Sequence, residues 1–347
     1  MHFVLQLIFA GVCVGAVYAL IAMGLSLTFW TTRTLNFGLT LSPEGRGKKK
    51  DDAMHFVLQL IFAGVCVGAV YALIAMGLSL TFWTTRTLNF GQGSLLMTAS
   101  VATVAMLGAG MPAALAVPLG ILLAGGLMVV AERIAIRPLL KSGDSMGWVV
   151  STLGLGIFLQ GFVSSVFGSQ AIAFPSLVFD SLDSVDVAGV QVSSQYLAVL
   201  GLSLTLMVAM ELFLRRSAWG RAVRAVSHDA DAAALAGIPV RRVIVLSFVA
   251  SGVLAGIAGV MVAQITGTVD PSFGFNLMVL GFVAAVFGGM GNTAGALVGG
   301  IALGVIEKLV GGYVSTAAEH GMAFAILMVI LAIRPQGLFG RKEFTKV

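Results

Sequence analysis

The longest polar stretch between the apolar segments of this chain runs from Trp219 to Ile238. It holds the side chains with the most chemistry to offer, which are Arg221, Arg224, His228, Asp229 and Asp231. Asp229 precedes an alanine-rich run, and its carboxylate can accept hydrogen bonds from the amides of a first helical turn, so we predict a short helix through about Ala236. Gly237 suits the left-handed residue after a last turn, and Pro239 prevents continuation. A short capped helix of this kind is typical of a docking element.

The sequence has no residues spaced for catalysis or metal binding. It contains no HExxH, nucleophile elbow, Cys/His cluster or P-loop, and the glycines of 288–291 are not followed by the Lys-Ser/Thr pair of a phosphate-binding loop. His228 and His320 are isolated from other metal-ligating residues. We therefore expect that the chain is not an enzyme and has no catalytic residue. We also expect that it binds no metal ion or cofactor itself.

The composition is that of a membrane protein, because only 10% of the 347 residues are charged and 58% are hydrophobic, whereas roughly a quarter are charged in soluble domains. Apolar runs of about twenty residues recur without alternation, which predicts an all-α polytopic membrane protein rather than a barrel. The net charge of +5 comes mainly from loops, where basic residues set orientation, so no nucleic-acid partner is expected. Cys13 and Cys66 lie mid-span and are predicted to be packing residues.

About eight or nine transmembrane helices are predicted, at roughly 57–82, 89–109, 113–131, 148–167, 196–214, 243–266, 275–289, 293–310 and 321–333. Basic residues gather in the connections 132–147 and 215–242 and in the tail, whereas 168–195 has Asp180, Asp183 and Asp186 but no lysine or arginine. Nine crossings that start outside place every basic stretch in the cytoplasm. The glycines of 288–291 allow a tight turn or a kink in one longer helix, and the turn is preferred because it keeps the tail inside.

Residues 1–38 and 54–91 are identical and are joined by the charged linker LTLSPEGRGKKKDDA. Exact identity indicates a recent duplication or an artefact of the gene assignment. If the first copy also spanned the membrane, the orientation of all later spans would conflict with their charges. We therefore expect 1–53 to be dispensable and 54–347 to form the transmembrane domain, with a cytoplasmic loop at about 215–242.

Small residues in the predicted spans recur at the four-residue spacing that lets helix backbones approach closely, in the pairs Gly64 and Gly68, Gly252 and Gly256, Gly295 and Gly299, and Gly300 and Gly304. Charged residues in the spans are few. Glu211, four residues before Arg215, is predicted to pair with it or to extend to the membrane interface rather than to bind a solute, and the adjacent Glu307 and Lys308 near the end of a span are interpreted in the same way. The polar residues that could line a path through the membrane are Asn89, Gln92, Ser94, Gln160, Gln264 and Asn276. Each of them could instead form a hydrogen bond between helices, and both interpretations stay open.

Four segments of the sequence are distinctive, namely LNFGQGSLLMTAS at 88–100, GRAVRAVSHDADAAALAGI at 220–238, AAVFGGMGNTAGALVGG at 284–300 and RPQGLFGR at 334–341. They resemble the permease family of branched-chain amino-acid ABC transporters, and more closely its LivH-type subunits. The resemblance covers essentially all of 54–347, whereas 1–53 departs from it.

The resemblance implies an ABC importer permease in a bacterial inner membrane, with the coupling loop and the C-terminus in the cytoplasm. In such importers a periplasmic binding protein delivers the amino acid, a second, LivM-like permease shares the translocation path, and two cytoplasmic ATPases bind and hydrolyse ATP. The loop 219–238 would be the coupling helix that docks on an ATPase. The residues carried over to that role are Gly220, Arg221, Arg224, Asp229, Ala232, Gly237 and Ile238.

Three alternatives stay open at this point. The same motifs serve importers of urea or short amides. A channel or secondary transporter would need no ATPase, although the dearth of charge within the spans argues against ion coupling. An intramembrane enzyme would need nucleophiles or metal ligands, and the sequence offers no candidates for either. For the loop 219–238, the alternative is a plain cytoplasmic loop whose arginines only enforce topology.

Overall fold

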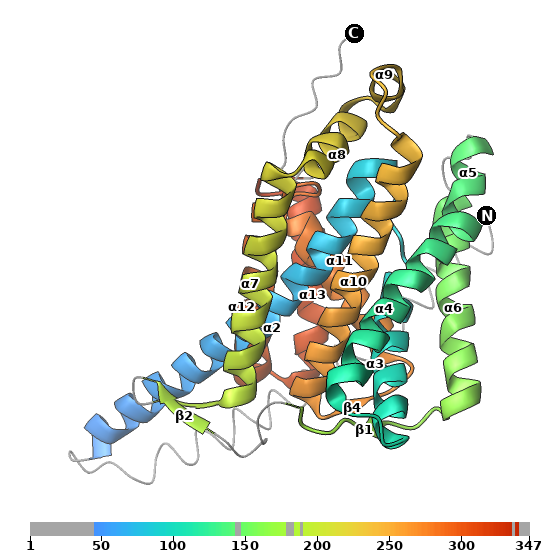
Figure 1. The fold of residues 1–347 in the computed structure, drawn as a ribbon. Helices are drawn as coiled ribbons and strands as arrows, with labels where there is room; N and C mark the ends of the chain where they lie inside the picture. The colour runs from blue at the N-terminus through green and yellow to red at the C-terminus, as the bar shows by residue number, and fades with distance from the viewer. Residues whose placement is uncertain (1–44, 143–146, 178–183, 188–189, 335–336, 340–347) are drawn as a thin grey trace, which may run out of the picture.

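The computed structural model of the chain describes residues 45–142, 147–177, 184–187, 190–334 and 337–339 (Figure 1). Its helices are α2 (Gly45–Thr85), α3 (Gln92–Gly108), α4 (Ala113–Ala131), the π-helix η1 (Glu132–Ile136), α5 (Arg137–Ser142), α6 (Gly147–Phe167), α7 (Ser194–Arg216), α8 (Ala218–His228), α9 (Ala230–Leu235), α10 (Val240–Thr266), α11 (Phe273–Gly288), α12 (Thr293–Tyr313) and α13 (Thr316–Ile333). Four short strands complete it, β1 (Ile172–Ala173), β2 (Ser184–Val187), β3 (Val190–Ser193) and β4 (Thr268–Val269).

The helices confirm the prediction of an all-α polytopic membrane protein. Among the described residues, six helices are long and apolar enough to cross a membrane, and three shorter apolar helices accompany them. These helices coincide with the predicted spans, including the separate pair α11 and α12. The turn between that pair has left-handed backbone at Gly289 (φ +96°) and Gly291 (φ +85°). The interpretation of a tight turn at 288–291, rather than a kink, is therefore confirmed.

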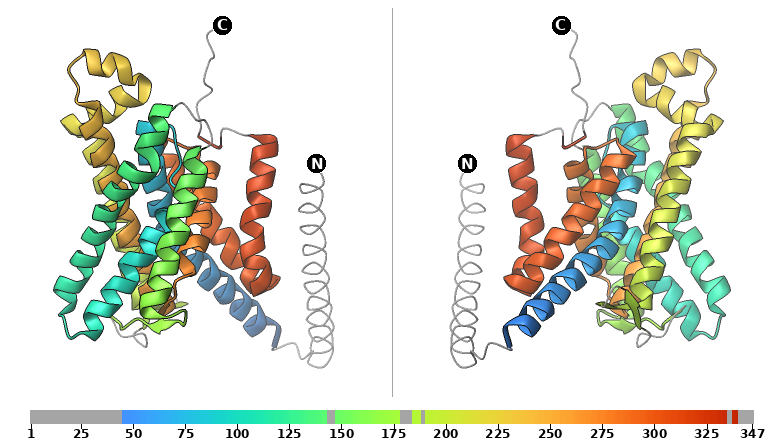
Figure 2. Two further views of the ribbon diagram at one scale, coloured as in Figure 1. Left: turned by 90° about the vertical axis from the view of Figure 1, so that its right-hand side faces the viewer. Right: turned by 90° about the vertical axis from the view of Figure 1, so that its left-hand side faces the viewer.

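Helix α2 forms the centre of the bundle. Its residues 68–81 are all buried, and it contacts α7, α8, α10, α11 and α12. A helix that is apolar on every side must be enclosed, and α2 is enclosed by other helices. It crosses the bundle obliquely, and its first turns extend away from the other helices (Figure 2). Cys66, on this helix, is fully buried, as expected for a packing residue.

The predicted glycine pairs lie where helices touch. A Cβ atom added at Gly300 of α12 would lie 2.5 Å from the Ala72 backbone nitrogen of α2, and one at Gly304 would lie 2.4 Å from the Gly64 carbonyl oxygen. Gly252 of α10 faces Ala124 of α4 in the same manner. Only a residue without a side chain allows backbones this close, so the packing interpretation of the pairs is confirmed.

Helix α3 starts deep within the bundle. The side-chain amide of Gln92, its first residue, donates a hydrogen bond to the Ile74 carbonyl oxygen of α2 at 3.3 Å. About 16 Å of helix separates Ile74 from Thr85, where α2 ends. Residues 86–91 therefore descend roughly half of a ~30 Å hydrocarbon core as irregular backbone. The predicted span 89–109 is correct in position, but it begins with a turn at 89–91 that is followed by a short helix.

The two ends of the bundle differ in charge. Helices α5, α8 and α9 and the arginines of 132–142 and 215–242 lie at one end (Figure 1). The strands lie at the other, where β1 pairs with β4 and β2 with β3, and Asp186 is paired with Gln191. The predicted separation of basic and Asp-bearing connections is thus present, although Asp180 and Asp183 lie outside the described residues.

Two of the predicted boundaries, at residues 53 and 132, fall inside helical segments. The connection 132–147 was expected to be a loop, but through Ser142 it is helical, because α4 runs on through η1 into α5. Helix α2 begins at Gly45, within the charged linker. Residues 1–44, which hold the whole of the first copy including Cys13, lie outside the described residues. The division at residue 53 stays a prediction.

The contact between α2 and α12 can be tested with Gly300→Ala. The added Cβ would meet backbone atoms of α2, so we expect destabilisation of about 1–3 kcal/mol, the usual range for overpacking. Thermal unfolding of the purified chain in detergent measures it. Gly154→Ala is the matched control, because a Cβ at Gly154 of α6 meets no described atom within 4 Å. Equal melting temperatures for both variants would contradict the close contact.

Candidate functional site

The polar stretch 219–238 folds into two helices, of which only the second was predicted. Helix α8 buries Gly220, Val223 and Val226, which are spaced three apart. Val223 and Val226 cluster with Leu80 of α2. The Ser217 hydroxyl caps its start by accepting a hydrogen bond from the Gly220 amide at 3.0 Å. Helix α8 therefore lies against the end of the bundle with one apolar face inward.

The corner between α7 and α8 depends on two of the predicted coupling residues. A Cβ atom at Gly220 would lie 1.8 Å from the Leu214 carbonyl oxygen, so no side chain fits there. The Arg224 side chain donates to that same oxygen at 2.6 Å, and Arg221 donates to the Arg216 carbonyl oxygen at 3.4 Å. These oxygens belong to the last turn of α7, where carbonyls lack helical partners and cations are favoured. The arginines thus fix the angle of α8.

Helix α9 is capped as predicted. The Asp229 carboxylate accepts from the amides of Asp231 and Ala232, both at 2.9 Å. At the other end Gly237 has a φ of +81° and its amide donates to Ala234, while the Ile238 amide donates to Ala233, the pairing of a Schellman motif. Because Ile238 also packs against Ala233, the ending is held by an apolar contact as well.

After Asp231, the exposed residues of α9 are all apolar. Ala232 and Ala234 point away from the bundle, and Leu235 is 91% exposed. In Figure 1, α8 and α9 project beyond the neighbouring helices. Leu235 therefore stands almost entirely uncovered at the projecting tip. Leu235 was not among the predicted site residues, although it lies in the predicted helix.

Three of the distinctive sequence segments meet beside α8. A pocket of about 650 Å³ is lined by residues of α2, α8, the turn before α12 and the C-terminal segment, among them Arg86, Ser227, Asn292 and Phe339. Arg86 donates to the Ser227 carbonyl oxygen at 3.1 Å, which ties α2 to α8. The Leu338 and Phe339 amides donate to the Phe287 and Gly288 carbonyl oxygens and so cap α11.

Glu211 joins this arrangement from α7. It pairs with Arg215, as predicted, and accepts a hydrogen bond from the Thr293 hydroxyl at the start of α12. Helices α7 and α12 are therefore linked beside the pocket. A second acidic residue, Glu307 of α12, is only 2% exposed, so it does not reach out of the bundle as an interfacial side chain would.

Two of the path candidates act as links between elements. Gln92 is fully buried, and besides its bond to Ile74 it accepts from the Ser251 hydroxyl of α10 at 3.3 Å. The Asn89 side-chain oxygen accepts from the Gly91 amide at 2.9 Å, and Thr152 of α6 accepts from the Phe90 amide at 3.3 Å. Irregular backbone at membrane depth requires such internal partners. That these residues also line a path stays a prediction.

The other four candidates are dispersed. Ser94 is buried near Gly156 of α6, Gln160 is half-buried on α6, and Asn276 is exposed at the start of α11. Gln264 lines an apolar cavity of about 280 Å³ between α4, α7 and α10, and accepts from the Leu177 amide at 3.1 Å. Gln195, which sequence reasoning missed, lines the same cavity. The six residues therefore do not form one site within this chain.

Comparison with known proteins decides the family. A family described as "Branched-chain amino acid transport system / permease component" matches residues 60–333. The chain belongs to this family. It is 34% identical over 303 residues to the high-affinity branched-chain amino acid permease LivH of Salmonella typhimurium, covering 84% of this chain and 98% of the relative. It is 33% identical over 304 residues to BraD of Pseudomonas aeruginosa, with the same coverage. The solved PsaBC of Streptococcus pneumoniae in complex with Fab is more distant, at 13% identity and a TM-score of 0.45, over 82% of this chain and 94% of that one.

The relatives are transport permeases, and this chain belongs to the same family of membrane transport components. Among its described residues, no three His, Cys, Asp or Glu side chains gather as metal ligands would. Membership of a transport family does not by itself explain the projecting pair α8 and α9. It also does not explain the pocket between α8, α2, the turn before α12 and the C-terminal segment.

The α7–α8 corner can be tested with Gly220→Ala. We expect the new methyl group to push α8 off the end of α7 at a cost of about 1–3 kcal/mol. Trypsin should then cut sooner at Arg221 and Arg224, which limited digestion in detergent measures. Gly201→Ala, on α7, is the control, since its Cβ meets no described atom within 4 Å. Identical digestion patterns would show that the corner does not require glycine.

Proposed function

We propose that this permease is a membrane subunit of an ATP-driven importer for branched-chain amino acids, and that α8 and α9 dock on a cytoplasmic ATPase subunit. The observation that carries the docking proposal is the exposed apolar tip of α9, with Leu235 at its end, on a helix capped at both termini. A short helix with an apolar face suits recognition by a groove on a partner. Rigid capping lowers the entropy lost when that face is bound.

The hydrogen bonds around α8 suggest how movement of the ATPase would reach the membrane. Arg86 ties α8 to α2, Arg224 ties it to α7, and Glu211 ties α7 to Thr293 of α12. A displacement of the docked helices would therefore pull on three spans together. In this scheme the ATPase subunits bind and hydrolyse ATP, and the permease itself carries no nucleotide.

The remaining partners follow from the family and the charges. We propose a second, LivM-like permease that completes the translocation path, because the polar candidates are dispersed within this chain, and a periplasmic binding protein that delivers the solute. The basic residues of 132–142 and 215–242 favour the cytoplasm for the α8–α9 end and for the C-terminus. The membrane would be the bacterial inner membrane.

Branched-chain amino acids are proposed as the solute because LivH and BraD are described as permeases for them. An apolar side chain is also compatible with the cavity at Gln195 and Gln264, which is otherwise apolar.

The solute can be tested by uptake of labelled leucine into host cells with the gene deleted and with it restored. We expect uptake to fall to background on deletion, and excess isoleucine or valine to compete while urea and acetamide do not. Unchanged leucine uptake together with lost urea or acetamide uptake would assign the chain to an importer of amides. Leucine uptake that continues after ATP depletion would instead indicate a channel.

Docking can be tested with Leu235→Asp. Because Leu235 is almost fully exposed, the variant should fold and insert normally, yet lose at least tenfold in affinity for the ATPase subunit, as a buried anchor residue does on replacement. Retention of the ATPase during purification in mild detergent measures this, with Leu235→Met as the conservative control. Full retention by Leu235→Asp would rule out the tip of α9 as the anchor.

A further inference from the structure

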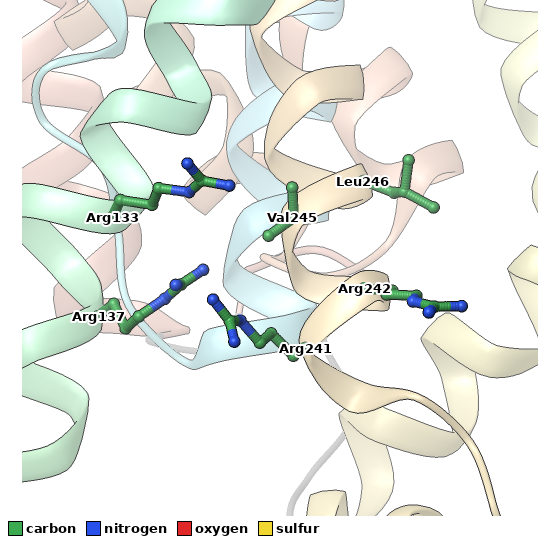
Figure 3. Close-up of a pocket in the computed structure, with 6 residues that line it drawn as sticks. All are labelled: Arg133, Arg137, Arg241, Arg242, Val245 and Leu246. Atoms are coloured by element: carbon green, nitrogen blue, oxygen red, sulfur yellow. The ribbon is translucent and has the colours of Figure 1, made fainter.

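A second basic site lies apart from α8 and α9. Arg133 and Arg137 from η1 and α5, with Arg241 and Arg242 from the first turn of α10, line a pocket of about 450 Å³ whose other lining residues are Val245 and Leu246. Figure 3 shows Arg133, Arg137 and Arg241 directed into the gap between the two helices, while Arg242 turns away from it. None of these arginines belongs to the predicted coupling residues.

The pocket carries an excess of positive charge. Glu132 neutralises Arg137 through two hydrogen bonds, of 3.0 and 2.7 Å. No ion pair found among the described residues involves Arg133, Arg241 or Arg242. Like charges held close together repel, and an anion between them removes the repulsion. Arginine also presents a planar fork of donors that matches the oxygens of a phosphate group.

The local backbone is arranged to produce this cluster. In η1 the chain follows the i to i+5 hydrogen-bonding pattern, which brings Glu132 beside Arg137, five residues later. Such π-turns within helices are frequent at functional sites. Glu132 is only 3% exposed and holds the Arg137 guanidinium in place. On the other side, tight packing of Gly252 against Ala124 holds α10 close to α4 below the pocket.

The position of the pocket points to the membrane surface. About 30 Å of helix separates Ala113, where α4 begins, from Arg133, which equals the thickness of a hydrocarbon core. The arginines therefore lie at the depth of lipid headgroups. The side chains beside them are apolar and exposed, with Ile134 67% and Leu246 50% accessible. A surface that is basic at headgroup level and apolar below it matches a phospholipid.

We propose that this pocket binds the phosphate of an anionic phospholipid in the leaflet at the α8–α9 end, with the acyl chains along Ile134, Val130 and Leu246. The acidic surface of a partner protein is the rival ligand. It is disfavoured because exposed apolar side chains adjoin the arginines, namely Leu246 in the pocket itself and Ile134 beside Arg133. The proposal does not depend on ATPase docking.

The test compares lipid retention by two double variants of the full chain, purified with whichever subunits accompany it. Arg133→Gln with Arg241→Gln removes two charges from the pocket. Arg216→Gln with Arg334→Gln, both exposed at the same end of the bundle, is the matched control. Each variant is reconstituted with phosphatidylglycerol and phosphatidylcholine in equal amounts, and the bound lipids are quantified by native mass spectrometry.

An arginine in contact with the lipid phosphate contributes about fivefold to binding, so the pocket variant should retain phosphatidylglycerol about 30-fold less well. The control should remain like the native chain, because its two arginines lie outside the pocket. Equal retention by both variants would overturn the proposal. So would displacement of the lipid by millimolar inorganic phosphate, which would indicate a site for the free anion. Loss of the ATPase subunit with unchanged phosphatidylglycerol would assign the pocket to a protein contact instead.

Discussion

Helices in a membrane gain no hydrophobic energy by packing on each other, because lipid tails are as apolar as leucine, so their association depends on close van der Waals contact between backbones. In this permease Gly64, Gly68, Gly300 and Gly304 provide that contact between α2 and α12. Helix α2 also touches α7, α8, α10 and α11, and its middle turns are buried on every side. The placement of the remaining spans therefore depends on the approach of these two helices.

The same demand for close approach recurs where the chain leaves the bundle. Gly220 allows α8 to begin directly on the last turn of α7, and the Arg224 side chain satisfies the Leu214 carbonyl that this corner exposes. Without such a corner, α8 and α9 would be a tethered loop. With it they form a rigid projection that ends in the exposed Leu235 of α9, and Arg86 connects that projection to the central helix. Rigidity at this point is what the proposed coupling requires.

The buried amides explain how the bundle accepts irregular backbone at membrane depth. Residues 86–91 lead into the bundle as irregular backbone before α3 begins. Each backbone polar group left there without a hydrogen-bond partner costs several kcal/mol in hydrocarbon. Asn89 and Thr152 supply partners for two of the backbone amides, and Gln92 connects α2 to α10 through Ser251. Their cost of burial is thus offset by bonds to the protein.

The sequence by itself determined the features that depend on neighbouring residues. The nine apolar segments, the caps of α9 at Asp229 and Gly237, the Glu211–Arg215 pair and the glycine pairs were all predicted, because hydropathy, capping and four-residue spacing are local patterns. Helix α8, the continuation of α4 through η1, the inner start of α3 and the role of Leu235 were not. The gathering of Arg133 with Arg241, and of Arg86 with Ser227, was decided only by the tertiary structure. Those residues are more than a hundred positions apart, and no local pattern specifies which helices become neighbours. That choice is made by the packing of whole helices around α2.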